Sequence, residues 1–288
     1  MRFPWNKYIE LPLESRNTLQ IFITNRCNLK CTGCFARNVM GESNKDISPE
    51  EYERAVESFV SKKGRQINLL GGEPFLHPHL HRLLCINAYY KLKTTIYTNG
   101  YHFDKVDKFL KRDFENVKLR VSIYSLKEGV KACGSIPDDS PRFDGNFMVS
   151  ANTTVNGLID AAYQCEFLHD CRVFFISSLR ELDNDRQEFF DDTDLTMPVV
   201  QYKELVHRFL DAYEGSMDIH VSKRGVFEST TSLCNNKCRF ANYFIGGKII
   251  QCPYDVVNLK YQDDYSFNER FCQQSNSCLM SKVIYRKR

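Results

Sequence analysis

The stretch from Thr18 to Phe35, TLQIFITNRCNLKCTGCF, decides how the rest of the chain is interpreted. Its first seven residues are rich in β-branched and aromatic side chains and predict a strand. A loop with the spacing C-x3-C-x2-C follows directly, with its thiols at Cys27, Cys31 and Cys34. Three thiolates on one short loop suit a [4Fe–4S] cluster whose fourth iron has no protein ligand. Such an open position on a metal centre is where chemistry occurs.

A zinc site and a disulfide framework are the alternatives for this loop. Structural zinc sites use two C-x2-C pairs or a Cys/His set, and no second pair or histidine follows at that distance. The N-terminus, Met1 to Trp5, has no apolar core followed by a cleavage site, so we expect no signal peptide. Twelve cysteines without an export signal indicate metal binding in a reducing compartment, and we expect the cytoplasm.

A second motif, Gly71-Gly72-Glu73-Pro74, follows the apolar segment 66–70. The cysteine loop and this GGEP loop, in this order, resemble the radical S-adenosylmethionine (SAM) superfamily. The resemblance implies that SAM chelates the open iron of the cluster and that the GGEP loop lies against the SAM amino group. Glycines suit this role because they let the backbone approach a ligand closely. The implied chemistry is one-electron cleavage of SAM to a 5′-deoxyadenosyl radical, with a reductase such as flavodoxin or ferredoxin as electron donor.

Three further polar residues at predicted strand ends are candidates for contacts with SAM. Asn99 belongs to Thr98-Asn99-Gly100, Ser122 matches the serine of a family Ser-Leu-Asp pattern, and Asn152 lies near the end of the predicted fifth strand. Ordinary strand-end hydrogen bonding is the alternative for each. The chain departs from the family at Tyr124, where the acid is expected. It also has Gly33 where many members place an aromatic before the third cysteine, which leaves the adenine contact open, with Phe35 as one candidate.

Strand-like and helix-like segments alternate along most of the chain, which predicts a parallel sheet with right-handed crossovers. The predicted strands are 18–24, 66–70, 94–98, 117–124, 147–154 and 172–176, and the predicted helices are 48–62, 80–90, 105–111, 157–168 and 201–213. Ser48 and Glu51 suggest a capping box for one helix, and Asn156 a cap for another. Alternation does not separate an open sheet from a barrel. The radical SAM resemblance implies a partial (β/α)6 TIM-type barrel, which we assign to residues 1–222.

The C-terminal part, residues 223–288, has little helical periodicity and holds five cysteines: Cys234, Cys238, Cys252, Cys272 and Cys278. It resembles the SPASM extension in its shortened "twitch" form, which implies an auxiliary [4Fe–4S] cluster. The preferred ligands are Cys234, Cys252, Cys272 and Cys278, and Cys238 replaces one of them or remains spare. Residues 244–250 predict a hairpin that turns at Gly246 and Gly247. A zinc ribbon is the alternative.

For most of the remaining cysteines and histidines, the sequence favours a structural role over a catalytic or metal-binding one. Cys85, Cys165 and Cys171 are expected to be small buried hydrophobic residues. Cys133 lies in a polar loop, where a substrate or redox role stays open. His77, His79 and His81 resemble a ligand set, but a helix start is the simpler account.

The bulk composition limits the partners. A net charge of +3 gives no clear nucleic-acid signal, and no apolar run is long enough to span a membrane. We expect a radical SAM enzyme acting on a small molecule or short peptide, with the insertion 126–146 bordering the substrate entrance. The alternatives are an activase that places a glycyl radical on a partner enzyme, and a non-catalytic iron–sulfur electron-transfer or scaffold protein. The GGEP loop argues against the last, because an electron carrier needs no SAM loop.

Overall fold

The computed structural model describes residues 8–10, 17–29, 31, 45–102, 116–123, 142–178, 197–222, 237–238, 241–250, 270–271 and 282–285. The chain forms two compact units. Unit 1 contains Met1–Leu13, Val121–Cys234 and Gln273–Arg288, and unit 2 contains Glu14–Arg120 and Asn235–Cys272. Strand β5 (Val117–Ile123) runs across the division in the chain.

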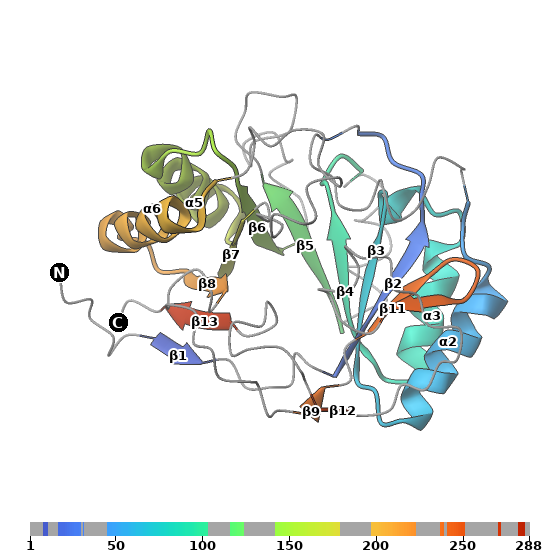
Figure 1. Ribbon diagram of the computed structural model, residues 1–288. Helices are drawn as coiled ribbons and strands as arrows, with labels where there is room; N and C mark the ends of the chain where they lie inside the picture. Colours follow the sequence, from blue (N-terminus) through green and yellow to red (C-terminus); the bar gives the residue numbers. More distant parts are fainter. Residues whose placement is uncertain are drawn as a thin grey trace. The chain divides into compact units, whose positions relative to one another are not determined.

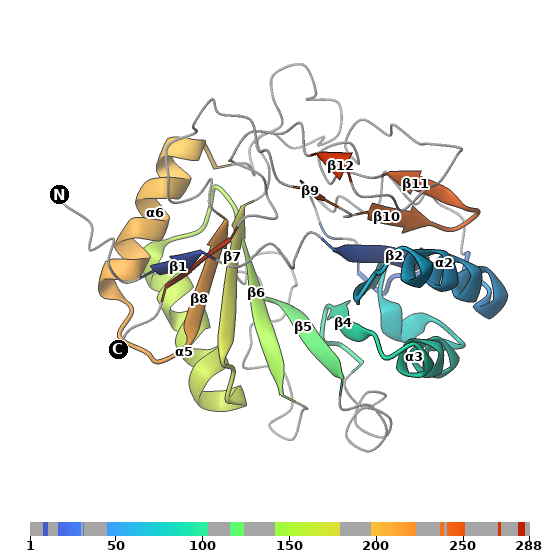
Figure 2. The ribbon, with the colours of Figure 1, turned by 90° about the horizontal axis from the view of Figure 1, so that it is seen from below.

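Unit 2 is built on three parallel strands, β2 (Thr18–Thr24), β3 (Gln66–Gly71) and β4 (Lys93–Thr98). Helix α2 (Pro49–Ser61) connects β2 to β3, and α3 (Leu80–Tyr89) connects β3 to β4. The two helices lie side by side on one face of these strands (Figures 1 and 2). The elements predicted between residues 18 and 98 are therefore confirmed, with bounds that shift by at most one residue.

A buried series of side-chain hydrogen bonds connects the two helices of unit 2 to the sheet. The Tyr52 hydroxyl on α2 donates to Asn87 Oδ1 on α3 at 2.7 Å, and Asn87 Nδ2 donates to Thr94 Oγ1 on β4 at 3.1 Å. The surrounding side chains are apolar and buried, among them Ile21, Phe59 and Leu69. Because each polar atom of this series has a partner, its burial among apolar groups costs little.

The start of α2 confirms one predicted contact and adds another. Ser48 caps the helix, its side chain accepting from Glu51 N at 3.1 Å. The Glu51 side chain binds a distant part of the sequence, since its Oε1 accepts from Tyr243 Oη at 3.1 Å and from Gly246 N at 2.8 Å. This carboxylate holds the predicted hairpin against the first turn of α2.

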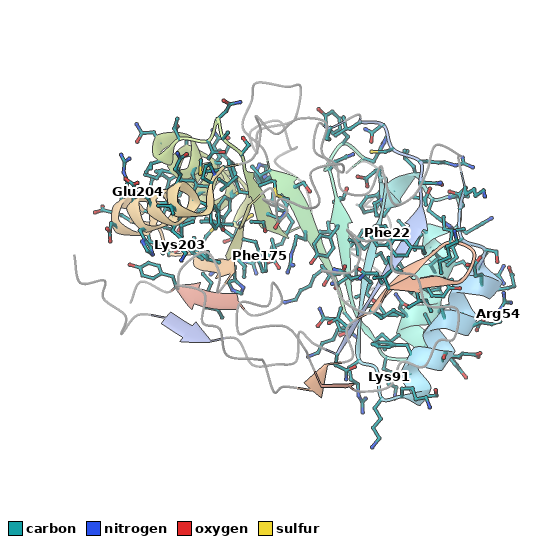
Figure 3. All side chains as sticks on the ribbon, in the orientation of Figure 1. Phe22, Arg54, Lys91, Phe175, Lys203 and Glu204 are labelled. Carbon is teal, nitrogen blue, oxygen red and sulfur yellow. The ribbon has the colours of Figure 1, made fainter. Side chains whose placement is uncertain are left out.

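The hairpin itself consists of β10 (Ala241–Phe244) and β11 (Lys248–Ile250), which pair antiparallel. It turns at Gly246 and Gly247, whose φ angles of 87° and 80° favour glycine. Strand β10 pairs in parallel with β2, with Ala241 opposite Leu19 (Figure 2). Phe22 of β2 stacks on Phe244 at a ring-centroid distance of 4.5 Å, while Arg54 and Lys91 extend from the surface of the unit (Figure 3). The hairpin is thus an added part of the sheet.

A separate two-stranded pair lies near the hairpin in sequence. Strand β9 (Lys237–Cys238) pairs antiparallel with β12 (Arg270–Phe271), and Cys238 lies opposite Arg270. This pair lies toward the end of unit 2 at which β2 begins (Figure 1).

Unit 1 contains the parallel strands β6 (Phe143–Val149), β7 (Val173–Ser178) and β8 (Asp218–Ser222). Strand β13 (Lys282–Tyr285) pairs antiparallel with β8, and β1 (Tyr8–Glu10) pairs antiparallel with β13. Helices α5 (Val155–His169) and α6 (Val199–Ala212) pack against each other (Figure 1). Strands β8, β13 and β1 were not among the predicted elements.

Several expectations for local structure were wrong. Strand β6 begins at Phe143, so the last part of the expected insertion 126–146 belongs to a strand. Thr154 caps α5 in place of Asn156, because its hydroxyl reaches Gly157 N at 3.1 Å. Cys165 and Cys171 are buried as expected, but Cys85 is exposed on α3. The predicted helix 105–111 and Cys133 lie outside the described residues.

The predicted α/β class with a parallel sheet is confirmed by both units. Within the described part of the chain, no helix combines the length and apolar character that crossing a membrane requires.

Candidate functional site

Three loops of unit 2 leave the sheet at the same edge. Because β2, β3 and β4 are parallel, their carboxyl ends lie together. The cysteine loop follows β2, the GGEP loop follows β3, and Thr98-Asn99-Gly100 ends β4. Ligand sites of parallel α/β sheets form at this edge. The sequence placed both motifs there, and the structure shows how they are joined.

Two backbone hydrogen bonds join the cysteine loop to the GGEP loop. Gly72 N donates to Thr24 O at 2.8 Å, and Glu73 N donates to Arg26 O at 2.7 Å. Both glycines are needed for this contact. A Cβ atom at Gly71 would lie 2.3 Å from Thr24 O, and one at Gly72 would lie 2.1 Å from Arg26 O and 2.9 Å from the Cβ of Cys27. From the sequence we expected the glycines to admit a ligand, whereas their immediate neighbour is the cysteine loop.

Glu73 is buried and extends this contact to the third loop. Its Oε1 accepts from Phe75 N at 3.1 Å and from Thr98 Oγ1 at 2.8 Å, and its Oε2 accepts from Asn99 N at 2.8 Å. Burial raises the pKa of Glu73 to about 7, although the three hydrogen bonds favour the carboxylate and act in the opposite direction. In this structure the carboxylate therefore connects protein loops. Pro74 is buried beside it, where the short 3-10 helix η3 (Pro74–Leu76) begins.

The start of the cysteine loop has a second support that sequence reasoning missed. Arg26 Nη2 lies 2.7 Å from Asp46 Oδ2, and the Thr24 hydroxyl donates to Asp46 Oδ1 at 2.6 Å. The Arg26 amide in turn donates to Thr24 Oγ1 at 3.1 Å. Asp46 immediately precedes the strong helix signal at Ser48, but nothing in the sequence links it to Arg26 twenty residues earlier.

Cys27 is exposed and Cys31 is half-buried. Leu29 N points at the Cys27 sulfur at a distance of 3.4 Å, so the backbone turns back around this side chain. Soft thiolates that receive amide hydrogen bonds are the ligands that iron–sulfur clusters use. The described cysteines thus fit a cluster that Cys27, Cys31 and Cys34 would hold. Cys34, Gly33 and Phe35 lie outside the described residues.

Asn99 contacts the cysteine loop. Its Nδ2 donates to Asn28 Oδ1 at 2.9 Å, and its Oδ1 accepts from Tyr101 N at 3.0 Å. The other two polar candidates belong to unit 1. Ser122 is half-buried on β5, and Asn152 is exposed in the turn after β6. Their expected contact with SAM stays a prediction, and Tyr124 lies outside the described residues.

The histidines after the GGEP loop have a structural role. His77 Nδ1 accepts from His79 N at 3.1 Å, which leaves Nε2 to donate to Ile47 O at 3.0 Å. Burial lowers the pKa of His77 and favours the neutral ring. Both ring nitrogens are therefore occupied, which supports the interpretation as a helix start. The described residues include no group of three or more His, Cys, Asp or Glu side chains placed to hold a metal ion.

Among the C-terminal cysteines, the structure describes the backbone of Cys238 alone. Cys234, Cys252, Cys272 and Cys278 lie outside the described residues, so the auxiliary site stays a prediction.

Comparison with known proteins agrees with this geometry. Residues 21–132, which include the cysteine loop, the GGEP loop and the end of β4, match the sequence profile of the radical SAM superfamily. This part of the chain is similar to a radical SAM domain. Members of this superfamily bind a [4Fe–4S] cluster together with SAM.

Curated relatives match a short part of the chain. GTP 3′,8-cyclase of Rhizobium etli (strain CIAT 652) is 36% identical over 67 residues, which are 23% of this chain and 19% of the relative. GTP 3′,8-cyclase of Rhizobium meliloti (strain 1021) is 31% identical over 93 residues, which are 30% of this chain and 27% of the relative. The match thus spans less than a third of either relative.

Solved structures extend the likeness to most of the chain. SuiB of Streptococcus suis bound to the precursor peptide SuiA has a TM-score of 0.66 at 16% identity, covering 89% of this chain and 65% of that chain. SuiB bound to S-adenosylmethionine has a TM-score of 0.61 at 18% identity, covering 87% of this chain and 68% of that chain. This likeness shows the fold alone, and it confirms the predicted class, a mixed α/β partial barrel that does not close.

The first test concerns the contact between the two loops. Replacing Gly72 by alanine places a methyl group against Arg26 O and Cys27, so we expect the variant to lose cluster iron as well as SAM binding. Iron content after anaerobic reconstitution and SAM affinity by calorimetry measure the two effects.

Gly157→Ala is the control, because its added Cβ would meet only Thr154 Oγ1, at 3.2 Å. A Gly72→Ala variant with normal iron and weakened SAM binding would contradict the role of Gly72 in joining the two loops.

Proposed function

We propose that the protein is a radical SAM enzyme that cleaves SAM reductively and abstracts hydrogen from a substrate. The observation that carries this proposal is the joining of the cysteine loop to the GGEP loop by two backbone hydrogen bonds. A bound cluster with SAM supplies the 5′-deoxyadenosyl radical when an external donor, such as flavodoxin or ferredoxin, provides one electron. The protein's own task is to hold the two loops in a fixed relation.

The described residues are suited to that task. The exposed Cys27 lies beside Gly72, and the half-buried Cys31 follows in the same loop, so a ligand on the cluster would lie next to the GGEP backbone. Glu73 accepts three hydrogen bonds and holds this backbone to the end of β4. Because these loops are already held in place, less entropy is lost when a bound group is oriented for reaction. We propose that the backbone of Gly71 to Pro74 faces SAM and that Ser122 and Asn152 contribute further contacts.

We propose a small molecule or a short peptide as substrate, and the cytoplasm as the location. The relatives point both ways, since the curated matches are named GTP 3′,8-cyclase and the SuiB structure contains a precursor peptide. An activase for a glycyl-radical enzyme is the alternative within enzymes, and a non-catalytic iron–sulfur carrier the alternative outside them. Formation of 5′-deoxyadenosine separates an enzyme from a carrier, and its dependence on added partner protein separates the activase.

We also propose an auxiliary [4Fe–4S] cluster held by the C-terminal cysteines, in the manner of a SPASM or twitch extension over 223–288. Two strand pairings support it. The β9–β12 pair sets Cys238 opposite Arg270, two positions before Cys272 in the sequence. The hairpin pairs Asn242 with Ile250, two positions before Cys252. The first pairing joins the strand that bears Cys238 to the strand that precedes Cys272, and the second places the strand after Cys238 beside the strand that precedes Cys252. Ligation by four of the C-terminal cysteines would add stability to the part that they join.

The main test removes one proposed cluster ligand. We expect Cys31→Ala to fold and to form no 5′-deoxyadenosine from SAM, because the variant lacks one of the three thiolates that would hold the cluster. Anaerobically reconstituted protein, dithionite and SAM followed by chromatography provide the measurement.

The matched control is Cys85→Ala, which removes an exposed thiol from α3 and should leave SAM cleavage unchanged. Undiminished 5′-deoxyadenosine formation by Cys31→Ala would refute the assignment of the cysteine loop.

The auxiliary cluster is tested by counting metal. Two [4Fe–4S] clusters predict about eight irons in reconstituted protein, and the triple variant of Cys27, Cys31 and Cys34 should retain about four. Elemental analysis that finds zinc, or neither metal, in the triple variant would rule out the second cluster.

A further inference from the structure

The cysteine loop is supported at two separate places. Residues up to Arg26 are held by the GGEP loop and by Asp46. Beyond Cys27, Asn99 Nδ2 at the end of β4 donates to Asn28 Oδ1 at 2.9 Å. Cys27 therefore lies between two anchored neighbours, Arg26 on one side and Asn28 on the other.

The backbone N–H of Asn99 and both polar atoms of its side chain make hydrogen bonds within the protein. Its backbone N–H donates to Glu73 Oε2, and its side-chain oxygen accepts from Tyr101 N. These two bonds fix the orientation of the amide, so that the NH2 group points at Asn28. The side chain is thus already committed to protein partners.

The position of Asn28 matters for the neighbouring sulfur. The next residue, Leu29, directs its N–H at Cys27 Sγ at 3.4 Å. Holding the Asn28 side chain restrains the peptide that carries this N–H. Hydrogen bonds to cluster sulfurs stabilise the more negatively charged, reduced state, and they are among the factors that set a cluster's reduction potential.

We propose that Asn99 is a positioning residue for the first cluster, acting through Asn28 on the Leu29 N–H bond to Cys27. This role replaces the SAM contact that the sequence suggested for Asn99. The proposal rests on the proposed function, because it requires a cluster on Cys27. The carboxylate of Glu73 and the amide of Asn99 then form one path from the GGEP loop to the cysteine loop.

The test is a double-mutant cycle on the reconstituted protein, with Asn28→Ala, Asn99→Ala and the double variant. Because the Asn28–Asn99 bond is exposed, its loss should leave the fold intact. We expect both single variants to lose iron to a chelator about 10-fold faster, as for other outer-shell partners of metal ligands. We also expect a more negative midpoint potential in a redox titration monitored by electron paramagnetic resonance.

The double variant should behave like either single variant, because the two side chains act through one bond. Asn17→Ala is the matched control, since Asn17 makes a comparable bond to Lys63 O at the other end of β2 and should change neither quantity. Should Asn99→Ala fail to fold, Asn28→Ala alone reports on the same bond.

Three results would overturn the proposal: additive effects of the two substitutions, a cluster unchanged relative to Asn17→Ala, or a raised KM for SAM with an unchanged cluster potential. Wild-type protein that binds no iron would refute the proposed function, whereas each of these three results leaves that function standing.

Discussion

The burial of one carboxylate constrains the whole edge of the sheet at which the cysteine loop emerges. Glu73 is removed from water, and this is tolerable because Phe75, Thr98 and Asn99 supply three hydrogen bonds to its two oxygens. Two of these donors are backbone amides, so their positions are set by the ends of β3 and β4. The adjacent Glu73 amide donates to Arg26 O and adds the end of β2. One residue thereby fixes three strand ends that the sequence separates widely.

This arrangement changes the interpretation of the glycines. Gly71 and Gly72 permit the GGEP loop to approach the backbone of Thr24 and Arg26, at distances that any side chain would prevent. The GGEP loop and the cysteine loop are thus joined by hydrogen bonds into one substructure. The C-terminal hairpin is joined to the same unit differently, through β10 beside β2 and through Glu51. A segment resembling an auxiliary extension is therefore anchored to the strand that leads to the first cysteine.

Local signals were sufficient to predict much of this molecule. The bounds 18–24 of β2 follow from its composition, and Ser48 before Pro49 marks the start of α2. The wrong cap of α5 came from two competing local signals. Thr154 and Asn156 are both favourable N-cap residues, and the position at which the helix begins selects Thr154. Strand β8 offered the alternation of Ile219 and Val221 with polar neighbours as a signal, but it is short. Contacts such as Arg26 with Asp46 and Glu51 with Gly246 depend on how distant segments meet, which no periodicity encodes.

The most direct test of this account is the iron content of Glu73→Gln after anaerobic reconstitution at pH 8. At this pH, above the raised pKa of Glu73, the wild-type side chain is a carboxylate with two accepting oxygens. Glutamine keeps the shape but turns an NH2 group toward the N–H of either Phe75 or Asn99, leaving a buried donor unsatisfied at a cost of about 1–3 kcal/mol. Glu50→Gln, at an exposed ion pair with Arg82, is the control. We expect Glu73→Gln to retain markedly less iron than Glu50→Gln, and equal iron in both variants would show that the Glu73 carboxylate does not hold the cysteine loop.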